Sequence, residues 1–317
     1  MKILVTGAAG FIGSHLSEAL SKLNHKVIGV DAITNYYNPE QKKLNIKSIS
    51  SAGVKFFVRD LATDNLLDLV SDAEIVFHLA AQPGISSIVP FSQYEKNNIT
   101  ATHKLLEAVK NNSSLKLFIN VATSSIYGLY ATGDENTLPK PASYYGVTKL
   151  AAEQLAFSYF YNQKLPVTSF RPFSVYGERE RPEKLYPKLI SSMLLDKEIN
   201  IFEGSESHTR SYTYVGDVVQ GLISSLDKIE SCTGEVFNIG TDHAITTGQG
   251  IAIVEKLLNK KALIKFIPKR TGDQMETSAN IKKIKNILGY VPQILPEEGL
   301  AKEIEWVRGA ISNGLSF

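Results

Sequence analysis

Residues 143–149, Ser-Tyr-Tyr-Gly-Val-Thr-Lys, combine residue types and a spacing that suit acid–base chemistry. Apolar residues recur at helical spacing from here to about Gln163, so we expect a helix on which Tyr145 and Lys149 point the same way. A tyrosine titrates near pH ~10, and a lysine ammonium beside it favours the phenolate. The pair is therefore suited to remove a proton from an alcohol whose carbon gives up hydride. The alternative is an exposed Tyr–Lys pair on a solvated helix face.

Three consecutive hydroxyl residues precede this helix by about twenty positions. Thr123, Ser124 and Ser125 follow the apolar run Leu115–Ala122, which reads as a strand. Their side chains are suited to hydrogen-bond an alcohol beside the phenolate. We therefore predict Tyr145, Lys149, Thr123 and Ser124 as the catalytic group.

The N-terminus has the order strand, glycine loop, helix, strand. Lys2–Thr6 is the first predicted strand, Phe11 opens a helix to about Leu23, and Val27–Val30 is a strand that ends at Asp31. Between the first strand and the helix, Gly7, Gly10 and Gly13 would let the backbone approach a pyrophosphate at the helix N-terminus. The spacing is G-x-x-G-x-x-G and not the standard G-x-G-x-x-G. A carboxylate at Asp31 would bind the adenosine ribose and repel a 2′-phosphate, which favours NAD over NADP.

The first half of the chain then alternates strands and helices. Further strands are expected at Val54–Val58, Glu74–Leu79, Leu115–Ala122 and Val167–Phe170, with a long helix at about 92–110. This alternation predicts an α/β fold with a Rossmann-type, doubly wound parallel sheet. Ligands bind beyond the carboxyl ends of such strands, where Asp60, Ala80 and Ala81 fall. Asp60 is either an adenine contact or a loop cap, and His78 is expected to be a packed strand residue.

The composition changes after Arg171. Prolines and Gly177 indicate an ordered loop, and the arginines up to Arg181 suit an anionic ligand, although a solvated charged loop is the alternative. Later helices and short strands predict a smaller α+β substrate-binding domain. We expect residues 1–171, joined by about 205–240, to form an NAD-binding Rossmann domain, and 172–317 mainly to bind substrate.

The composition excludes several classes of protein. Of 317 residues, 43% are hydrophobic and 21% charged, which is ordinary for a globular enzyme. A net charge of +2 without a basic stripe argues against nucleic-acid binding. One cysteine, Cys232, fits a reducing cytoplasm, and no apolar run is long enough to cross a membrane. Since no His, Cys or Asp cluster has metal-ligand spacing, no metal is expected.

Taken together, these segments make the chain resemble the extended short-chain dehydrogenase/reductase family, and within it the NAD-dependent nucleotide-sugar epimerases and dehydratases. The similarity runs nearly end to end. It rests on eight segments: residues 6–13 (TGAAGFIG) with Asp31, Asp60-Leu61, His78-Leu79-Ala80-Ala81, Thr123-Ser124-Ser125, Tyr145-x-x-x-Lys149, Arg171-Pro172-Phe173, residues 210–215 (RSYTYV) and Arg270-Thr271-Gly272-Asp273.

The resemblance implies roles for matching positions. The backbone near Phe11 and Ile12 would bind the pyrophosphate of NAD, Lys149 would also hold the nicotinamide ribose, and Arg210 and Arg270 would bind the diphosphate of a UDP-sugar. The implied cofactor-binding residues are Gly7, Gly10, Phe11, Ile12, Gly13, Asp31, Asp60, Leu61, Ala80, Ala81, Tyr145 and Lys149. The implied substrate-binding residues are Ser125, Ser174, Arg181, Arg210, Arg270 and Asp273. A homodimer through a four-helix bundle, formed by helices 92–110 and 144–163, is also implied.

The substrate depends on fewer residues. Family dehydratases carry Asp-Glu, and decarboxylases Glu, where this chain has Ser124-Ser125, which favours a 4-epimerase. The segment around Tyr36 and the arginine-rich loop look most like UDP-glucuronate 4-epimerases, in which a Thr matching Ser174 and an Arg matching Arg181 hold the sugar carboxylate. Pro172 replaces the more common Tyr. We predict interconversion of UDP-glucuronate and UDP-galacturonate; the alternatives are a UDP-glucose/UDP-galactose 4-epimerase, a dehydratase or decarboxylase, and a non-catalytic NAD(H)-sensing protein.

Overall fold

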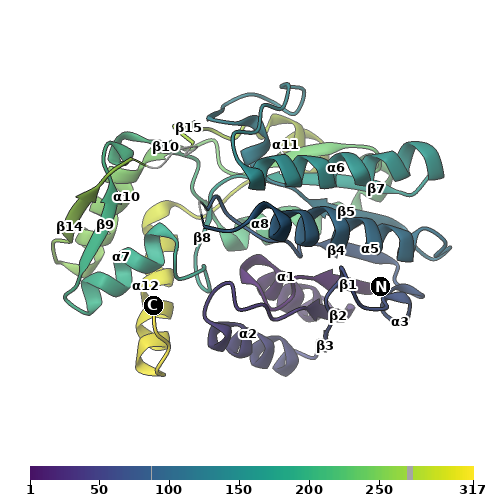
Figure 1. Ribbon diagram of the computed structural model, residues 1–317, viewed down its shortest axis with the longest axis horizontal. Helices are drawn as coiled ribbons and strands as arrows, with labels where there is room; N and C mark the ends of the chain where they lie inside the picture. Colours follow the sequence, from purple (N-terminus) through teal and green to yellow (C-terminus); the bar gives the residue numbers. More distant parts are fainter. Residues whose placement is uncertain (87, 270–273) are drawn as a thin grey trace.

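The computed structural model describes residues 1–86, 88–269 and 274–317 (Figure 1). Two predicted substrate-binding residues, Arg270 and Asp273, lie outside the described residues. Their assignment stays a prediction.

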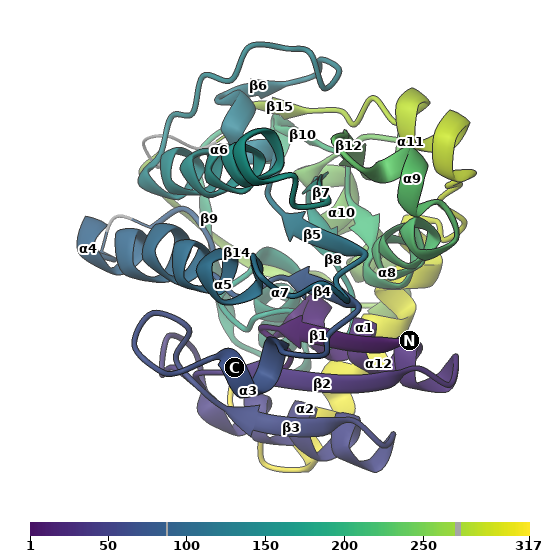
Figure 2. The same ribbon diagram turned by 90° about the vertical axis from the view of Figure 1, so that its right-hand side faces the viewer.

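A parallel sheet dominates the larger part of the molecule. Within the described residues it has seven strands in the order β12-β7-β5-β4-β1-β2-β3, and every neighbouring pair is parallel (Figure 2). This order confirms the predicted Rossmann-type, doubly wound α/β fold. The strands are β1 (Lys2–Thr6), β2 (Lys26–Asp31), β3 (Lys55–Val58), β4 (Ile75–His78), β5 (Leu117–Val121), β7 (Val167–Pro172) and β12 (Val236–Ile239).

Helices cover both faces of this sheet because successive strand residues point to opposite sides. In β1, Ile3 and Val5 pack into one core while Leu4 packs into the other. The first core is closed by α1 (Phe11–Lys22), α2 (Pro39–Ser51), α8 (Val215–Ile223) and α11 (Lys282–Leu288). The second is closed by α3 (Leu67–Val70), α5 (Ala101–Val109) and α6 (Tyr144–Gln163).

The predicted long helix at 92–110 contains an irregular turn. It consists of α4 (Phe91–Tyr94), a π-helical turn over Glu95–Thr100 and then α5. Inside it, the Thr102 hydroxyl donates to the Asn98 carbonyl oxygen at 2.6 Å. Single π turns interrupt helices most often at functional sites. The turn directs the buried Asn98 side chain toward the loop that follows β4.

The smaller part of the molecule lies to the left in Figure 1. It contains α7 (Leu185–Leu194), α10 (Thr247–Leu258) and α12 (Pro296–Ser312), beside the parallel pair β9 (Glu198–Phe202) and β14 (Leu263–Ile267). Their shared core includes Leu189, Val254 and Leu300, all fully buried. A capping box starts α10, where the Thr246 hydroxyl and the Gln249 side chain satisfy each other's backbone N–H groups. Sequence reasoning did not predict α10 or α2.

Short elements complete the described chain: β6 (Tyr130–Ala131), β8 (Val175–Tyr176), β10 (Thr209–Arg210), β11 (Thr213–Tyr214), β13 (Ile245–Thr246), β15 (Glu276–Thr277), α9 (Ile229–Cys232), and 3-10 turns at Ser124–Tyr127, Ser205–Ser207 and Ser224–Asp227. β12 adds to the main sheet beside β7. The division into residues 1–171 with 205–240, and 172–317, stays a prediction. Among the helices of the described residues, none has the length and apolarity to cross a membrane.

Candidate active site

One cavity of about 550 Å³ lies at the carboxyl ends of β1, β2, β4 and β5, between the two parts of the molecule. It brings together every predicted site residue that the structure describes. These are Gly7, Gly10, Phe11, Ile12, Gly13, Asp31, Asp60, Leu61, Ala80, Ala81, Thr123, Ser124, Ser125, Tyr145, Lys149, Ser174, Arg181 and Arg210.

The glycine loop forms the floor of the cavity. The Gly10 N–H donates to the Gly7 carbonyl oxygen at 3.0 Å, and a Cβ at Gly13 would lie 2.1 Å from the same oxygen. A side chain at residue 13 would therefore push the loop away from α1. The compact turn leaves the N-terminus of α1 open to the cavity, where its free N–H groups suit a phosphate.

The turn after β4 is fixed to β1 through a buried polar chain. The Thr6 hydroxyl accepts from the backbone N–H groups of Leu79 and Ala80, each at 3.1 Å, and contacts His78 Nδ1 at 2.8 Å. His78 Nε2 contacts the Thr102 hydroxyl at 2.8 Å. Burial lowers the pKa of His78 to about 3, so its ring is neutral. His78 is a packed strand residue, as the sequence indicates.

Asp31 lies at the end of β2, beside Lys42, a residue that the sequence reasoning missed. Its carboxylate accepts from the Ile33 N–H at 2.8 Å and lies 3.5 Å from Lys42 Nζ, and both side chains are largely buried. Lys42 comes from α2, a helix without a clear amphipathic pattern in the sequence. Lys42 therefore places a positive charge beside the Asp31 carboxylate at the predicted ribose position.

Asp60 takes one of the two roles that the sequence left open, that of a loop cap. Its carboxylate accepts from the Ala62 N–H at 2.9 Å and pairs with Lys96 at 2.7 Å, so it caps the loop after β3. The same side chain lines the cavity beside Leu61. An adenine contact there stays a prediction.

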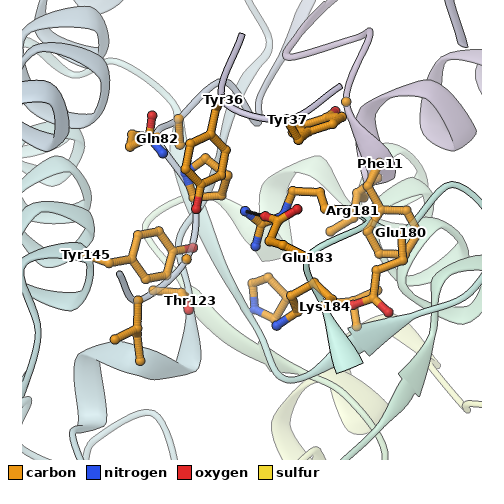
Figure 3. A pocket seen from close by; sticks show the side chains of 18 of the residues that line it. Phe11, Tyr36, Tyr37, Gln82, Thr123, Tyr145, Glu180, Arg181, Glu183 and Lys184 are labelled. Carbon is orange, nitrogen blue, oxygen red and sulfur yellow. Dashed lines mark ion pairs between the residues drawn. The ribbon is translucent and has the colours of Figure 1, made fainter. Parts of the chain in front are cut away.

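The N-terminus of α6 sets the catalytic geometry. The Ser143 hydroxyl accepts from the Gly146 N–H at 3.1 Å and caps the helix. A Cβ at Gly146 would lie 2.6 Å from the Ser125 carbonyl oxygen, so a glycine lets α6 press against the 124–127 turn. As a result, the hydroxyl ends of Tyr145 and Thr123 point toward one another across the cavity wall (Figure 3).

Burial has the largest effect on the pKa values of Tyr145 and Lys149. It raises the pKa of Tyr145, and the nearby Thr123 hydroxyl and the Arg181 guanidinium lower it only in part. The prediction that Tyr145 has a lowered pKa is therefore wrong for this arrangement. Burial also lowers the pKa of Lys149 to about 8, against the opposing effect of Glu153. Lys149 lines the same cavity.

The three arginines between residues 171 and 181, at the end of β7 and after it, have different roles. Arg171 is buried and bonds Glu153 through Nε at 3.0 Å and Nη2 at 2.7 Å. Arg179 pairs with Glu18 of α1 at 2.9 Å. Arg181 lines the cavity. The prediction that the arginines together suit an anionic ligand is thus corrected, because two of them pair with carboxylates on α6 and α1.

The Arg181 guanidinium faces Tyr145 and Thr123 across the open space (Figure 3). It lies 2.7 Å from the Glu183 carboxylate and 5.5 Å from the ring centre of Tyr36. Arg210, on the far wall, donates to the Thr209 and Gln274 carbonyl oxygens. A hydroxyl pair suited to proton transfer and a buried cation therefore share one cavity.

Comparison with known proteins decides the family. The model of the NAD dependent epimerase/dehydratase family matches residues 3–240. The chain belongs to this family. A crystal structure of UDP-glucuronic acid 4-epimerase from Bacillus cereus, with UDP-glucuronic acid and NAD, superposes with a TM-score of 0.93 at 38% identity, covering 98% of this chain and 99% of that one.

The names of two proteins related by sequence mention different sugars. A Bacillus subtilis protein, "Uncharacterized UDP-glucose epimerase YtcB", is 37% identical over 97% of this chain and 98% of its own length. "UDP-glucuronate 4-epimerase 5" of Arabidopsis thaliana is 33% identical over 98% of this chain and 76% of its own length. The family is therefore shared, while these two names differ in the sugar.

In this member of the epimerase/dehydratase family, Asn98 holds a cavity residue in place, and sequence reasoning missed it. Its amide oxygen accepts from the Gln82 N–H at 2.7 Å, and its nitrogen donates to the Thr148 hydroxyl at 2.9 Å. Gln82 lines the cavity, and Thr148 precedes Lys149 on α6. The signal available in the sequence was an asparagine at an inward-facing position of the predicted helix 92–110.

Proposed function

We propose that the protein is an NAD-dependent 4-epimerase that interconverts UDP-glucuronate and UDP-galacturonate. The observation that carries the proposal is the arrangement of Tyr145 and Thr123 opposite the Arg181 guanidinium in a single cavity. A proton acceptor and a cation on opposite sides suit a sugar that has both a reacting hydroxyl and a carboxylate. Similarity to the Bacillus cereus enzyme crystallised with UDP-glucuronic acid and NAD supports the same substrate.

The described residues fit a dinucleotide. The compact glycine loop leaves the N-terminus of α1 open to the cavity, and Asp31 lies at the end of the next strand. Gly10, Phe11 and Ile12 would hold the pyrophosphate, and Asp31 the adenosine ribose. NAD, when bound, supplies a cationic hydride acceptor, whose charge also favours the Tyr145 phenolate, and returns the hydride later, so the reaction has no net redox change.

Tyr145 takes the proton from the 4′-hydroxyl of the sugar and later returns a proton to the new hydroxyl. Thr123 and Ser124, at the carboxyl end of β5, orient that hydroxyl beside the phenolate. Lys149 lines the same cavity as Tyr145 and, even with a pKa of about 8, is mostly protonated at neutral pH, so it would add positive charge to the site. Between the two proton transfers, the 4-keto sugar turns over about its diphosphate link.

Binding of the sugar carboxylate by Arg181 and Ser174 would have a second consequence. A 4-keto-uronic acid is a β-keto acid and loses CO2 when the bond to its carboxylate aligns with the ketone π system. Arg181 and Ser174, both lining the cavity, would hold the carboxylate away from this alignment. We expect Arg181→Ala to weaken binding of UDP-glucuronate and to raise the share of decarboxylated product; unchanged affinity and product ratio would refute this role.

A UDP-glucose 4-epimerase is the second candidate, favoured by the name of the Bacillus subtilis relative. Both candidates use the same catalytic group, and they differ in whether Arg181 binds a carboxylate. The test is to incubate the purified protein with UDP-glucuronate, and separately with UDP-glucose, without added NAD. An isomer of UDP-glucuronate that co-elutes with UDP-galacturonate supports the proposal.

Other products would identify the remaining alternatives. A product lighter by CO2 indicates a decarboxylase, and turnover of UDP-glucose alone indicates the neutral-sugar epimerase. No turnover of either substrate leaves a dehydratase acting on another nucleotide sugar or an NAD(H)-sensing protein. If Tyr145→Phe retained full turnover, the assignment of the base would be wrong.

We also propose a cytoplasmic homodimer. The outer surface of α4 and α6 exposes apolar side chains, among them Phe91 and Tyr144, whose rings lie 5.4 Å apart, and Val147. The long helix that begins with α4 covers most of the predicted bundle segment 92–110, and α6 covers 144–163. Val147→Glu should convert a dimer to a monomer in light scattering. A monomeric wild-type protein would refute the bundle.

A further inference from the structure

The Arg181 guanidinium already has a carboxylate beside it. Glu183, two residues later in the same loop, places Oε1 2.7 Å from Arg181 Nη1 (Figure 3). Both residues line the cavity. The Arg181 side chain is 13% exposed and that of Glu183 is 37% exposed. The cation is therefore fixed in the wall of the cavity, while its partner reaches solvent.

The contact is close, but its alignment is poor. Within the described residues, Arg181 Nη1 is buried and has no partner with hydrogen-bond geometry, although Glu183 Oε1 is near it. The Tyr36 ring covers the guanidinium at 5.5 Å and does not neutralise its charge. An arginine fork binds a carboxylate best through two aligned N–H groups. A better-aligned carboxylate could therefore replace Glu183.

A second carboxylate is disfavoured while Glu183 stays beside Arg181. Like charges at this distance repel, so a uronate that approaches Arg181 must either tolerate Glu183 or displace it. Displacement is inexpensive for Glu183, because its side chain is already partly in water. Moving Arg181 would be costlier, since its guanidinium would lose the packing under Tyr36.

We propose that Glu183 is an internal counter-ion that competes with the sugar carboxylate for Arg181 and so sets the affinity for uronate substrates. This inference rests on the proposed function. When UDP-glucuronate binds, its carboxylate takes the place of the Glu183 carboxylate, which rotates toward solvent. A neutral sugar leaves the Arg181–Glu183 pair intact. Glu183 is thus a specificity-determining residue and takes no part in proton transfer.

The test compares Glu183→Gln with the wild type for epimerisation of UDP-glucuronate. Removal of the competing charge should lower KM about two- to fivefold, the range that measured pairs of partly exposed charges support, and leave kcat unchanged. Binding of UDP-glucose, measured by calorimetry, should not tighten. Glu183→Asp keeps the charge and should retain a KM nearer to that of the wild type.

Glu40→Gln is the matched control. Glu40 is an exposed carboxylate on α2 whose ion-pair partner is Lys43, so its removal changes the net charge equally without touching Arg181. An equal fall in KM in Glu40→Gln would assign the effect to general attraction of an anionic substrate and overturn the proposal. An unchanged or higher KM in Glu183→Gln would also overturn it, and a higher KM would mean that Glu183 orients Arg181.

The proposed function and the role of Glu183 can be refuted separately. If the wild-type protein does not epimerise UDP-glucuronate, the proposed function is wrong and the role of Glu183 falls with it. If the wild type is active and Glu183→Gln has the KM of the wild type, only the role of Glu183 is wrong. Thermal unfolding of each variant shows whether Glu183→Gln is folded, and calorimetric binding of UDP-glucuronate by Glu183→Asp provides a second measurement.

Discussion

Arg171→Met should destabilise the fold far more than the loss of a surface ion pair. The Arg171 and Glu153 side chains are 5% and 0% exposed. Arg171 makes two bonds to Glu153 and also donates through Nη1 to the Tyr127 hydroxyl at 2.7 Å and the Glu135 carbonyl oxygen at 3.1 Å. In the described part of the chain, the Glu153 carboxylate would keep the hydrogen bond from the Ser169 hydroxyl, at 2.9 Å, and its electrostatic interaction with Lys149.

The magnitude follows from the uncompensated charge. Removing one partner of a buried pair costs about 3–5 kcal/mol, because the remaining ion is no longer neutralised. For a chain of 317 residues this is a fall in Tm of about 5–8 °C, if the entropy of unfolding scales with length. Differential scanning calorimetry and urea unfolding at pH 7 would measure it. The double variant Glu153→Leu/Arg171→Met should recover much of the loss, because the buried charge is then gone.

Arg308→Met is the control, since Arg308 pairs with Glu305 on the surface and their side chains are 50% and 70% exposed. Its cost should stay below about 1 kcal/mol. The reasoning fails if Arg171→Met costs no more than this control. It also fails if the losses in unfolding free energy of the two single variants, Arg171→Met and Glu153→Leu, simply add in the double variant. The two residues would then act independently.

Three further predictions concern the cavity wall and a buried residue behind it. Burial raises the pKa of Glu180 from 4.5 to about 8, so its stabilising effect is full below pH 4.5 and is lost as pH rises through about 8; Glu180→Gln should flatten the fall in Tm over this window, and an identical pH profile would count against it. Asp31→Ser should lower the affinity for NAD about tenfold or more and leave Lys42 free to attract the 2′-phosphate of NADP, as cofactor titration would test; unchanged NAD preference would contradict it. Asn98→Leu should cost about 1–3 kcal/mol in urea unfolding, because the buried Gln82 N–H loses its acceptor, and wild-type stability would argue against this.

Sequence reasoning predicted the main sheet well because its strands and loops carry local signals. β1, β2 and β5 are short apolar runs, and the glycines between β1 and α1 mark a turn that few other residues allow. The predicted Tyr145 helix begins at its Ser143 cap, as expected. In these places, propensity, pattern and turn chemistry agree, so the sequence is sufficient.

The remaining features depend on contacts between distant segments. Arg171 and Arg181 stand ten positions apart in one loop-rich segment, yet one is enclosed by Glu153 and the other faces the cavity. Nothing local separates them. Lys42 was missed because α2 lacks a clear apolar stripe, and the pKa of Tyr145 was misjudged because the extent of burial depends on the whole cavity. The described residues contain no group of three or more His, Cys, Asp or Glu side chains suited to a metal, and the metal prediction itself stays untested.

The placement of β12 has a consequence for protein engineering. A cut after residue 171 would strip β7 of its outer neighbour, since β12 forms that edge, and would remove α8, which packs against α1. The truncated sheet would expose β7, a buried strand left without a partner on one side, as a site where other chains can add. Residues 172–317 therefore cannot be removed as a unit. A chimaera with a new sugar specificity would have to keep this chain's own α8 and β12, and exchange loops around them.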